Sequence, residues 1–232
     1  MKKIFYSILI FLLILLNFST VCADDVDNEI DFEDTIEVTA SNVSELPKTN
    51  SRRYIVYDRI SKSMIIGKNE DVKSAMASTT KIMTSIVILE KADLDEMVTV
   101  SAKAGGTGGS RLGLKKGDKA SVKNLLYGLM LRSGNDAAVA LAEHVGGSVK
   151  GFAELMNEKA SELGLTNTHF VTPHGLDDAN HYTTALELAK LTDYAMNNET
   201  FSKIVGTKSI MIYINNQPRQ INNTNELLGA LN

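Results

Sequence analysis

The sequence predicts an α+β fold in which an antiparallel sheet is interrupted by an all-helical insertion. Strand-like alternation occurs twice, over residues 53–71 and again over residues 208–224. Between these two segments, apolar residues recur at helical spacing for more than a hundred residues. Strands, then helices, then strands again are typical of one sheet that is built from both ends of a domain.

Each strand-like segment predicts a β-hairpin. The first reads RYIVYDRISKSMIIGKNED, rich in Ile, Val and Tyr, with a polar break at 58–62. The second reads KSIMIYINNQPRQINNT, where Asn215 and Asn216 predict the turn.

Five segments predict helices, because their apolar residues fall on one face and several end at Gly or Asn. In chain order they are TTKIMTSIVILEKA, VKNLLYGLMLRS, DAAVALAEHVG, VKGFAELMNEKASELG and TTALELAKLTDYAMNN. Thr183 or Thr184 is expected to cap the last of them. The glycine-rich AGGTGGSRLGLKKGD lacks the Gly-Lys-Ser/Thr ending of a phosphate loop and is predicted to be a loop near the mouth of a cleft.

The N-terminus predicts an exported protein. Two lysines precede the apolar run IFYSILIFLLILL, and Val-Cys-Ala before Asp24 offers a cleavage site, so residues 1–23 are expected to be a signal peptide. An uncleaved signal anchor is the alternative. Residues 24–50 predict an acidic flexible leader, and 51–232 the folded domain. The only cysteine is Cys22, so cleavage would leave no thiol for a disulfide, catalysis or a metal.

Composition excludes several classes of function. The net charge of −4 and the absence of Trp argue against a nucleic-acid-binding surface. The four histidines show no His-Glu-x-x-His spacing, so we expect neither a zinc site nor another metal or cofactor, and each histidine is expected to be a structural hydrogen-bonding residue.

Ser78 is the candidate nucleophile, in the segment MASTTKIMT. It is the only serine followed three residues later by lysine, Lys81. Residues three apart on a helix share a face, so the Lys81 amine can reach the Ser78 hydroxyl. A serine needs a base to become a nucleophile, and burial lowers the pKa of a lysine enough for it to act as that base. The competing interpretation is an ordinary helix cap.

A second element, Ser133-Gly134-Asn135, falls between two predicted helices. Plain turn chemistry would explain these residue types, since Ser, Gly and Asn are common in turns. As a functional element, the turn would project into a cleft a hydroxyl able to relay a proton, from Ser133, and a carboxamide able to hold an amide, from Asn135.

Together these segments resemble the exported D-alanyl-D-alanine carboxypeptidases, the low-molecular-mass penicillin-binding proteins of peptidase family S11. The resemblance rests on MASTTKIMT, LLYGLMLRSGNDAAVALAEHVGG, FAELMNEKASELGLTNTHFVTPHGLDDANHYTTALELAKL and NTNELL, in that order. It implies a β-lactamase/transpeptidase-like fold and favours Ser78 as a nucleophile over a cap.

The resemblance also implies a reaction. Ser78 would attack the bond between the two terminal D-alanines of a peptidoglycan pentapeptide, with Lys81 as base, Ser133 helping the leaving D-alanine and Asn135 orienting the peptide. β-Lactams would acylate Ser78, and the protein would act outside the cytoplasm, at the cell wall, meeting the membrane only through its signal peptide.

The sequence departs from the family in its third motif, Lys-Thr-Gly. Lysine is followed by Ser or Thr at Lys48, Lys62, Lys73 and Lys208, and none of these pairs is followed by Gly. We therefore expect a truncated or fragmentary sequence with an incomplete sheet. Two alternatives to a carboxypeptidase follow: a non-catalytic remnant that binds peptidoglycan or β-lactam, and a β-lactamase, for which no convincing deacylating Glu is seen.

Overall fold

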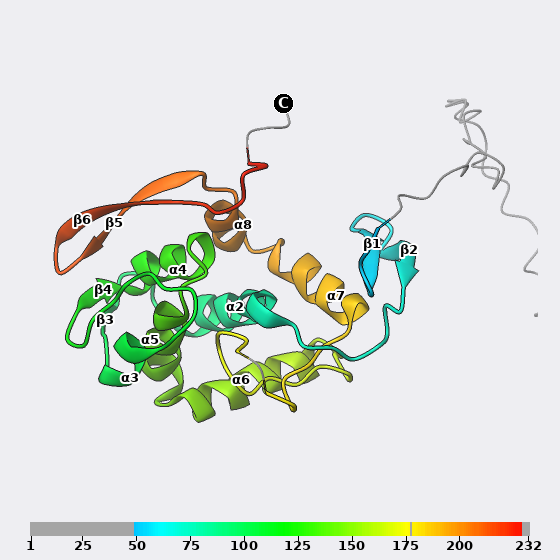
Figure 1. Ribbon diagram of the computed structural model, residues 1–232, viewed down its shortest axis with the longest axis horizontal. Helices are drawn as coiled ribbons and strands as arrows, with labels where there is room; N and C mark the ends of the chain where they lie inside the picture. Colours follow the sequence, from blue (N-terminus) through cyan, green and yellow to red (C-terminus); the bar gives the residue numbers. More distant parts are fainter. Residues whose placement is uncertain (1–48, 177, 229–232) are drawn as a thin grey trace, which may run out of the picture. The chain divides into compact units, whose positions relative to one another are not determined.

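Two β-hairpins enclose a block of helices along the chain (Figure 1). The computed structural model describes residues 49–176 and 178–228, so the predicted signal peptide and almost all of the predicted leader lie outside the described residues. β1 (Tyr54–Asp58) pairs antiparallel with β2 (Ser63–Lys68), and β5 (Ser209–Ile214) with β6 (Gln217–Asn222). Both predicted hairpins are confirmed.

The turn of the second hairpin follows from its two asparagines. Asn215 and Asn216 have φ of 54° and 60°, and Ile214 pairs with Gln217 across them. Two successive residues with positive φ match the right-handed twist of the strands they join, and asparagine tolerates that conformation better than most residues.

The sheet differs from the sequence prediction. The described strands form three separate two-stranded sheets, and β1–β2 is not hydrogen-bonded to β5–β6. The third sheet, β3 (Met97–Thr99) with β4 (Lys119–Ser121), lies inside the segment that was predicted to be all-helical. Its strands have three residues each, which is too short for a period of two to be visible in the sequence.

The five predicted helices are confirmed, and α3, α8 and a 3-10 turn were not predicted. In chain order, the predicted and unpredicted helical elements together are η2 (Ala77–Thr80), α2 (Lys81–Lys91), α3 (Ala102–Gly106), α4 (Val122–Leu131), α5 (Asn135–Gly146), α6 (Val149–Glu162), α7 (Ala185–Ala195) and α8 (Glu199–Val205). Thr184, one of the two predicted candidates, caps α7 by accepting a hydrogen bond from the Glu187 N–H.

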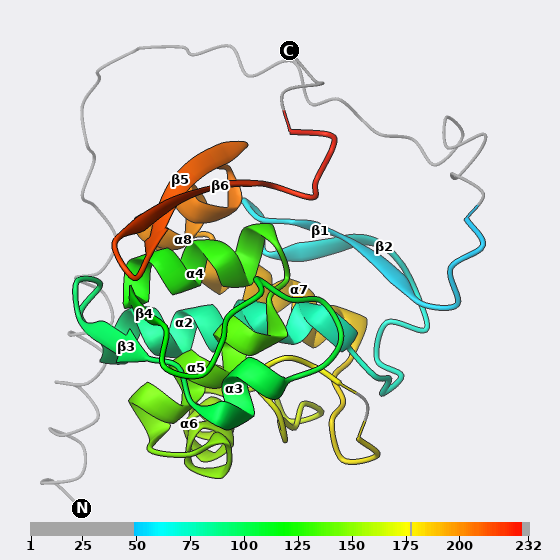
Figure 2. The ribbon, with the colours of Figure 1, turned by 60° about the vertical axis from the view of Figure 1, so that its left-hand side comes forward.

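Helix α2 lies in the middle of the helical block (Figure 2). It contacts α4, α5, α6, α7 and α8, and residues 83–88 are all buried. Helix α5 is buried as completely over residues 135–142. Both candidate functional segments therefore begin helices that enter the core, so their first residues are held by extensive packing.

Candidate active site

The structure brings Ser78, Lys81 and Ser133 into direct contact. The Ser78 hydroxyl oxygen lies 3.0 Å from Lys81 Nζ and 2.9 Å from Ser133 Oγ. Ser78 lies in η2, Lys81 is the first residue of α2, and Ser133 lies in the loop between α4 and α5. The Ser78 side chain caps neither η2 nor α2. The hydrogen bonds of its hydroxyl among the described residues are with Lys81 and Ser133, the two groups that a nucleophile at this position would need.

Lys81 is buried without a carboxylate partner in the described part of the chain. The residue is 2% exposed, and burial lowers the pKa of its amine from 10.5 to about 8. Besides Ser78, Nζ donates a hydrogen bond to the His174 carbonyl oxygen, at 2.9 Å. A lysine in such a site holds a neutral amine in a useful fraction of molecules near neutral pH.

Ser133 is held in a conformation that few non-glycine residues adopt. Its φ is +52°, in the left-handed region, directly before Gly134. Such backbone strain persists only where the surroundings impose it, and it is found preferentially at functional sites. Here the conformation accompanies the 2.9 Å contact between the Ser133 and Ser78 hydroxyls.

Asn135 has one satisfied and one unsatisfied polar atom. The residue is 4% exposed; its Nδ2 donates to the Gly108 carbonyl at 2.8 Å, and its Oδ1 is buried without a hydrogen-bond partner among the described residues. Gly109, with φ +80°, leaves space for the Asn135 amide, because a Cβ at this position would lie 2.6 Å from Nδ2. The glycine-rich segment therefore borders this residue, and a ligand N–H is the natural partner of the free Oδ1.

Asp136 ties the same loop to α5. Its fully buried carboxylate accepts hydrogen bonds from the backbone N–H groups of Leu112, Gly113 and Leu114 at 2.7–2.8 Å. Arg111 Nε lies 3.8 Å away. Asp136 thus fixes the loop that holds Asn135 Nδ2.

Sequence reasoning did not find the segment that packs behind the Ser78 turn. Thr84 donates to the Pro173 carbonyl at 2.7 Å, and Lys81 to that of His174. Gly175 is buried with φ +85°, and a Cβ there would overlap the Ala77 carbonyl oxygen. Nearly a hundred residues separate this segment from η2 in the sequence, so no local spacing could have joined them.

The imidazoles of His174 and His181, in and just after this segment, are both hydrogen-bonded. His174 Nδ1 accepts from the Leu176 N–H at 3.1 Å. Burial lowers the pKa of His174 to about 4, and Lys81 acts in the same direction. His181 Nδ1 lies 2.9 Å from the Val171 nitrogen, and Nε2 lies 2.8 Å from Thr80 Oγ1. Burial also lowers the pKa of His181.

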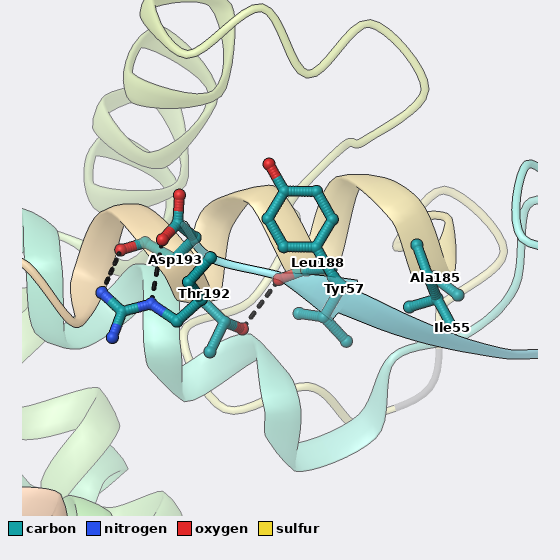
Figure 3. Close-up of a pocket in the computed structure, with 8 residues that line it drawn as sticks. Ile55, Tyr57, Ala185, Leu188, Thr192 and Asp193 are labelled. Carbon is teal, nitrogen blue, oxygen red and sulfur yellow. Dashed lines mark hydrogen bonds and ion pairs between the residues drawn. The ribbon is translucent and has the colours of Figure 1, made fainter. Parts of the chain in front are cut away.

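An apolar pocket of about 350 Å³ lies between β1 and α7 (Figure 3). Ile55, Tyr57 and Leu188 line it, and Asp193 closes one end with both Arg59 and Lys62 on its carboxylate. The pocket contains neither Ser78 nor Lys81. Its carboxylate is already neutralised, so the pocket offers no reactive group.

In the described part of the chain, no three His, Cys, Asp or Glu side chains are grouped so as to hold a metal ion. No described helix is long and apolar enough to span a bilayer.

A serine followed three residues later by a buried lysine and joined by a second serine, on an α+β scaffold, is the arrangement of the penicillin-binding class of serine hydrolases. The profile of the family "peptidase S11, D-alanyl-D-alanine carboxypeptidase" matches residues 39–232, and the chain belongs to this family.

Curated relatives of the chain carry the same family name. The chain is 36% identical over 180 residues to the D-alanyl-D-alanine carboxypeptidase DacF of Bacillus subtilis, covering 75% of this chain and 46% of that protein. It is 40% identical over 188 residues to DacC of Escherichia coli, covering 71% and 47%. The chain thus spans about half the length of these curated relatives.

Solved structures confirm the fold. The D-alanyl-D-alanine carboxypeptidase from Mycobacterium tuberculosis is similar at a TM-score of 0.76 and 33% identity, over 81% of this chain and 71% of that one. Penicillin binding protein 6B from Escherichia coli is similar at 0.71 and 33%, over 79% and 61%. The predicted β-lactamase/transpeptidase-like fold is therefore confirmed.

Proposed function

We propose that this chain carries the acylation centre of a serine D,D-carboxypeptidase, which removes the terminal D-alanine from peptidoglycan stem peptides. The observation that carries the proposal is the position of the Ser78 hydroxyl, between a buried lysine with a lowered pKa and a second hydroxyl. The family and its named relatives supply the substrate class.

Acylation begins with neutral Lys81. Its lone pair accepts the Ser78 hydroxyl proton as Oγ attacks the carbonyl carbon between the two D-alanines. The C–N bond of the tetrahedral intermediate then breaks. Its nitrogen takes the Ser133 hydroxyl proton, and the Lys81 ammonium then gives its proton to Ser133 Oγ, which leaves Lys81 neutral. D-Alanine leaves as a free amine, and the remaining peptide is an ester of Ser78.

Deacylation uses the same groups. Lys81, neutral again, accepts a proton from water as the water oxygen attacks the ester carbonyl, and the proton returns to Ser78 Oγ as the C–O bond breaks. A cyclic amide of the β-lactam class would acylate Ser78 by the same first step, and its ring opening would leave no separate amine.

Two groups orient the substrate. Asn135 Oδ1, buried and without a partner among the described residues, would accept an N–H of the stem peptide. The backbone N–H of Ser78 would donate to the oxygen that becomes negative in the tetrahedral intermediate. The Asn135 amide is held by the bond from its Nδ2 to the Gly108 carbonyl, and groups positioned in advance are the condition for electrostatic stabilisation of a transition state.

The place of action follows from substrate and sequence. Peptidoglycan lies outside the cytoplasm, and the first 23 residues have the features of a signal peptide. We propose an exported protein whose catalytic domain works at the extracytoplasmic face.

D-Alanine release from an N-acetylated pentapeptide ending in D-Ala-D-Ala tests the proposal. We expect release by the wild-type chain, none by Ser78→Ala, and release with a raised KM by Asn135→Ala, since truncation removes the amide acceptor. Folding of each variant is checked by circular dichroism. A folded wild-type chain that reacts with penicillin but releases no D-alanine would instead support a binding protein, and reaction with neither would refute the proposal.

A further inference from the structure

We propose that His181 is a positioning residue of this centre: through Thr80 and the Ala77 carbonyl, it fixes the direction of the Ser78 backbone N–H. This inference deepens the proposed function and rests on it, because that N–H is the proposed oxyanion donor. Three hydrogen bonds in series lie behind the Ser78 turn and connect Val171 to Ala77.

The direction of the first bond fixes the state of the imidazole. The Val171 N–H can only donate, so His181 Nδ1, 2.9 Å away, accepts and carries no proton. In a neutral ring the proton is then on Nε2, which donates to Thr80 Oγ1 at 2.8 Å. His181 is 2% exposed, and burial outweighs the Asp178 carboxylate in keeping its pKa below the ordinary value.

The second and third bonds continue in the same direction. Because Thr80 Oγ1 accepts from the imidazole, its own proton is available, and it donates to the Ala77 carbonyl at 2.7 Å. Each donor in such a series strengthens the next, since accepting a hydrogen bond polarises a hydroxyl toward donation. The series ends on the residue directly before the candidate nucleophile.

The last bond matters because Ala77 and Ser78 share one peptide unit. The carbonyl of Ala77 and the N–H of Ser78 lie on opposite sides of a planar trans group, so holding the carbonyl aims the N–H. Ala77 has φ +46°, a left-handed conformation that costs an alanine free energy and needs support from its surroundings. Gly175, which leaves no room for a Cβ against this carbonyl, supplies the steric half of that support.

The remaining contacts of the ring hold it in place. Phe170 packs edge-on to it, with ring centroids 5.8 Å apart. His181 also follows a turn in which its own N–H bonds to the Asp178 carbonyl. These contacts raise a competing explanation, in which the imidazole only anchors the 170–172 segment through Nδ1.

Two substitutions separate the explanations. His181→Gln keeps a donor at the distance of Nε2 and loses the Nδ1 acceptor, whereas His181→Asn keeps an acceptor at the distance of Nδ1 and loses the bond to Thr80. The readout is the rate at which a fluorescent penicillin acylates Ser78, at saturating and at low concentration. His144→Asn, which changes a histidine paired with Glu96, is the matched control and is expected to leave the rate unchanged.

Positioning predicts that His181→Gln stays within about threefold of the wild-type rate, while His181→Asn and Thr80→Val fall by about 10- to 100-fold at saturation. The half-saturating concentration should change little, because the defect lies in the transition state. Thr80→Ser, which keeps the hydroxyl that Thr80→Val removes, should acylate at close to the wild-type rate. A slower His181→Gln than His181→Asn, equal losses in both, or no loss in either would overturn the proposal.

A ligand-free measurement keeps this test separate from the proposed function. In ¹⁵N spectra at pH 7.5, His181 should show an unprotonated Nδ1 and a protonated Nε2, and amide exchange at Ser78 and Thr79 should be faster in Thr80→Val than in Thr80→Ser. The reverse tautomer, or equal exchange, overturns the positioning role even if the wild-type chain proves not to react with penicillin.

Discussion

The pKa of Lys81 sets how the acylation rate depends on pH. Burial lowers it from 10.5 to about 8. At pH 7 the neutral amine is therefore about a tenth of the total, against roughly 3 in 10,000 at the ordinary pKa, a gain of about 300-fold in usable base. Raising the pH from 7 to 9 should increase the neutral fraction, and with it the acylation rate, by about tenfold.

The assay is stopped-flow acylation by a fluorescent penicillin between pH 6.5 and 9.5. His174, with its pKa at about 4, stays neutral throughout this window, and burial moves the pKa of His181 in the same direction, below its ordinary value. Lys81→Met should abolish acylation, while Lys91→Met, on the exposed end of the same helix, should leave the profile unchanged. A flat profile, or a rate still rising steeply at pH 9.5, would refute the assignment of Lys81 as the base.

Three further predictions concern stability. Gly175→Ala should cost about 3 kcal/mol or more in the free energy of unfolding, because its Cβ would overlap the Ala77 carbonyl at a positive φ; a denaturation midpoint within error of wild type would contradict this. Asp136→Asn should cost about 3 kcal/mol, since one amide oxygen cannot replace a buried carboxylate that accepts from three backbone N–H groups; an unchanged melting temperature would show that the loop does not depend on that charge. The two histidines with lowered pKa should make the protein less stable below pH 6.5, because the unfolded chain takes up their protons first; for His174 the loss continues down to about pH 4. Melting temperature from pH 7.5 to 5, compared with that of His174→Asn/His181→Asn, checks this, and parallel curves would contradict it.

Elements with a strong local signal could be predicted from the sequence. The sequence predicted the apolar face of α2, the Asn215-Asn216 turn and a cap at Thr183 or Thr184, of which Thr184 is the cap, because each depends on residues within a few positions of one another. The seven-residue α8 and the three-residue β3 and β4 were missed. Their short segments leave too few apolar positions to establish a period.

In the candidate site, too, residues near one another in the sequence could be predicted and distant ones could not. Spacing alone predicted Lys81 beside Ser78, and the family resemblance added Ser133 and Asn135; the structure brings Ser133 into contact with Ser78, while the side chain of Asn135 bonds to Gly108. Nothing local connected His181 to Thr80, since 101 residues separate them and their contact exists only once the chain has folded. The supporting residues of a site are set by tertiary packing, so one sequence could indicate the candidate reacting groups but not the residues that hold them in place.

The most direct test of the central claim is the intact mass of the folded chain after incubation with benzylpenicillin, measured beside Ser78→Ala. We predict one added penicilloyl group on the wild-type chain and none on the variant, because the hydroxyl held by Lys81 and Ser133 is the proposed reacting group. An unmodified wild-type chain of demonstrated folding, or an adduct that persists in Ser78→Ala, would contradict the claim that this arrangement is an acylation centre.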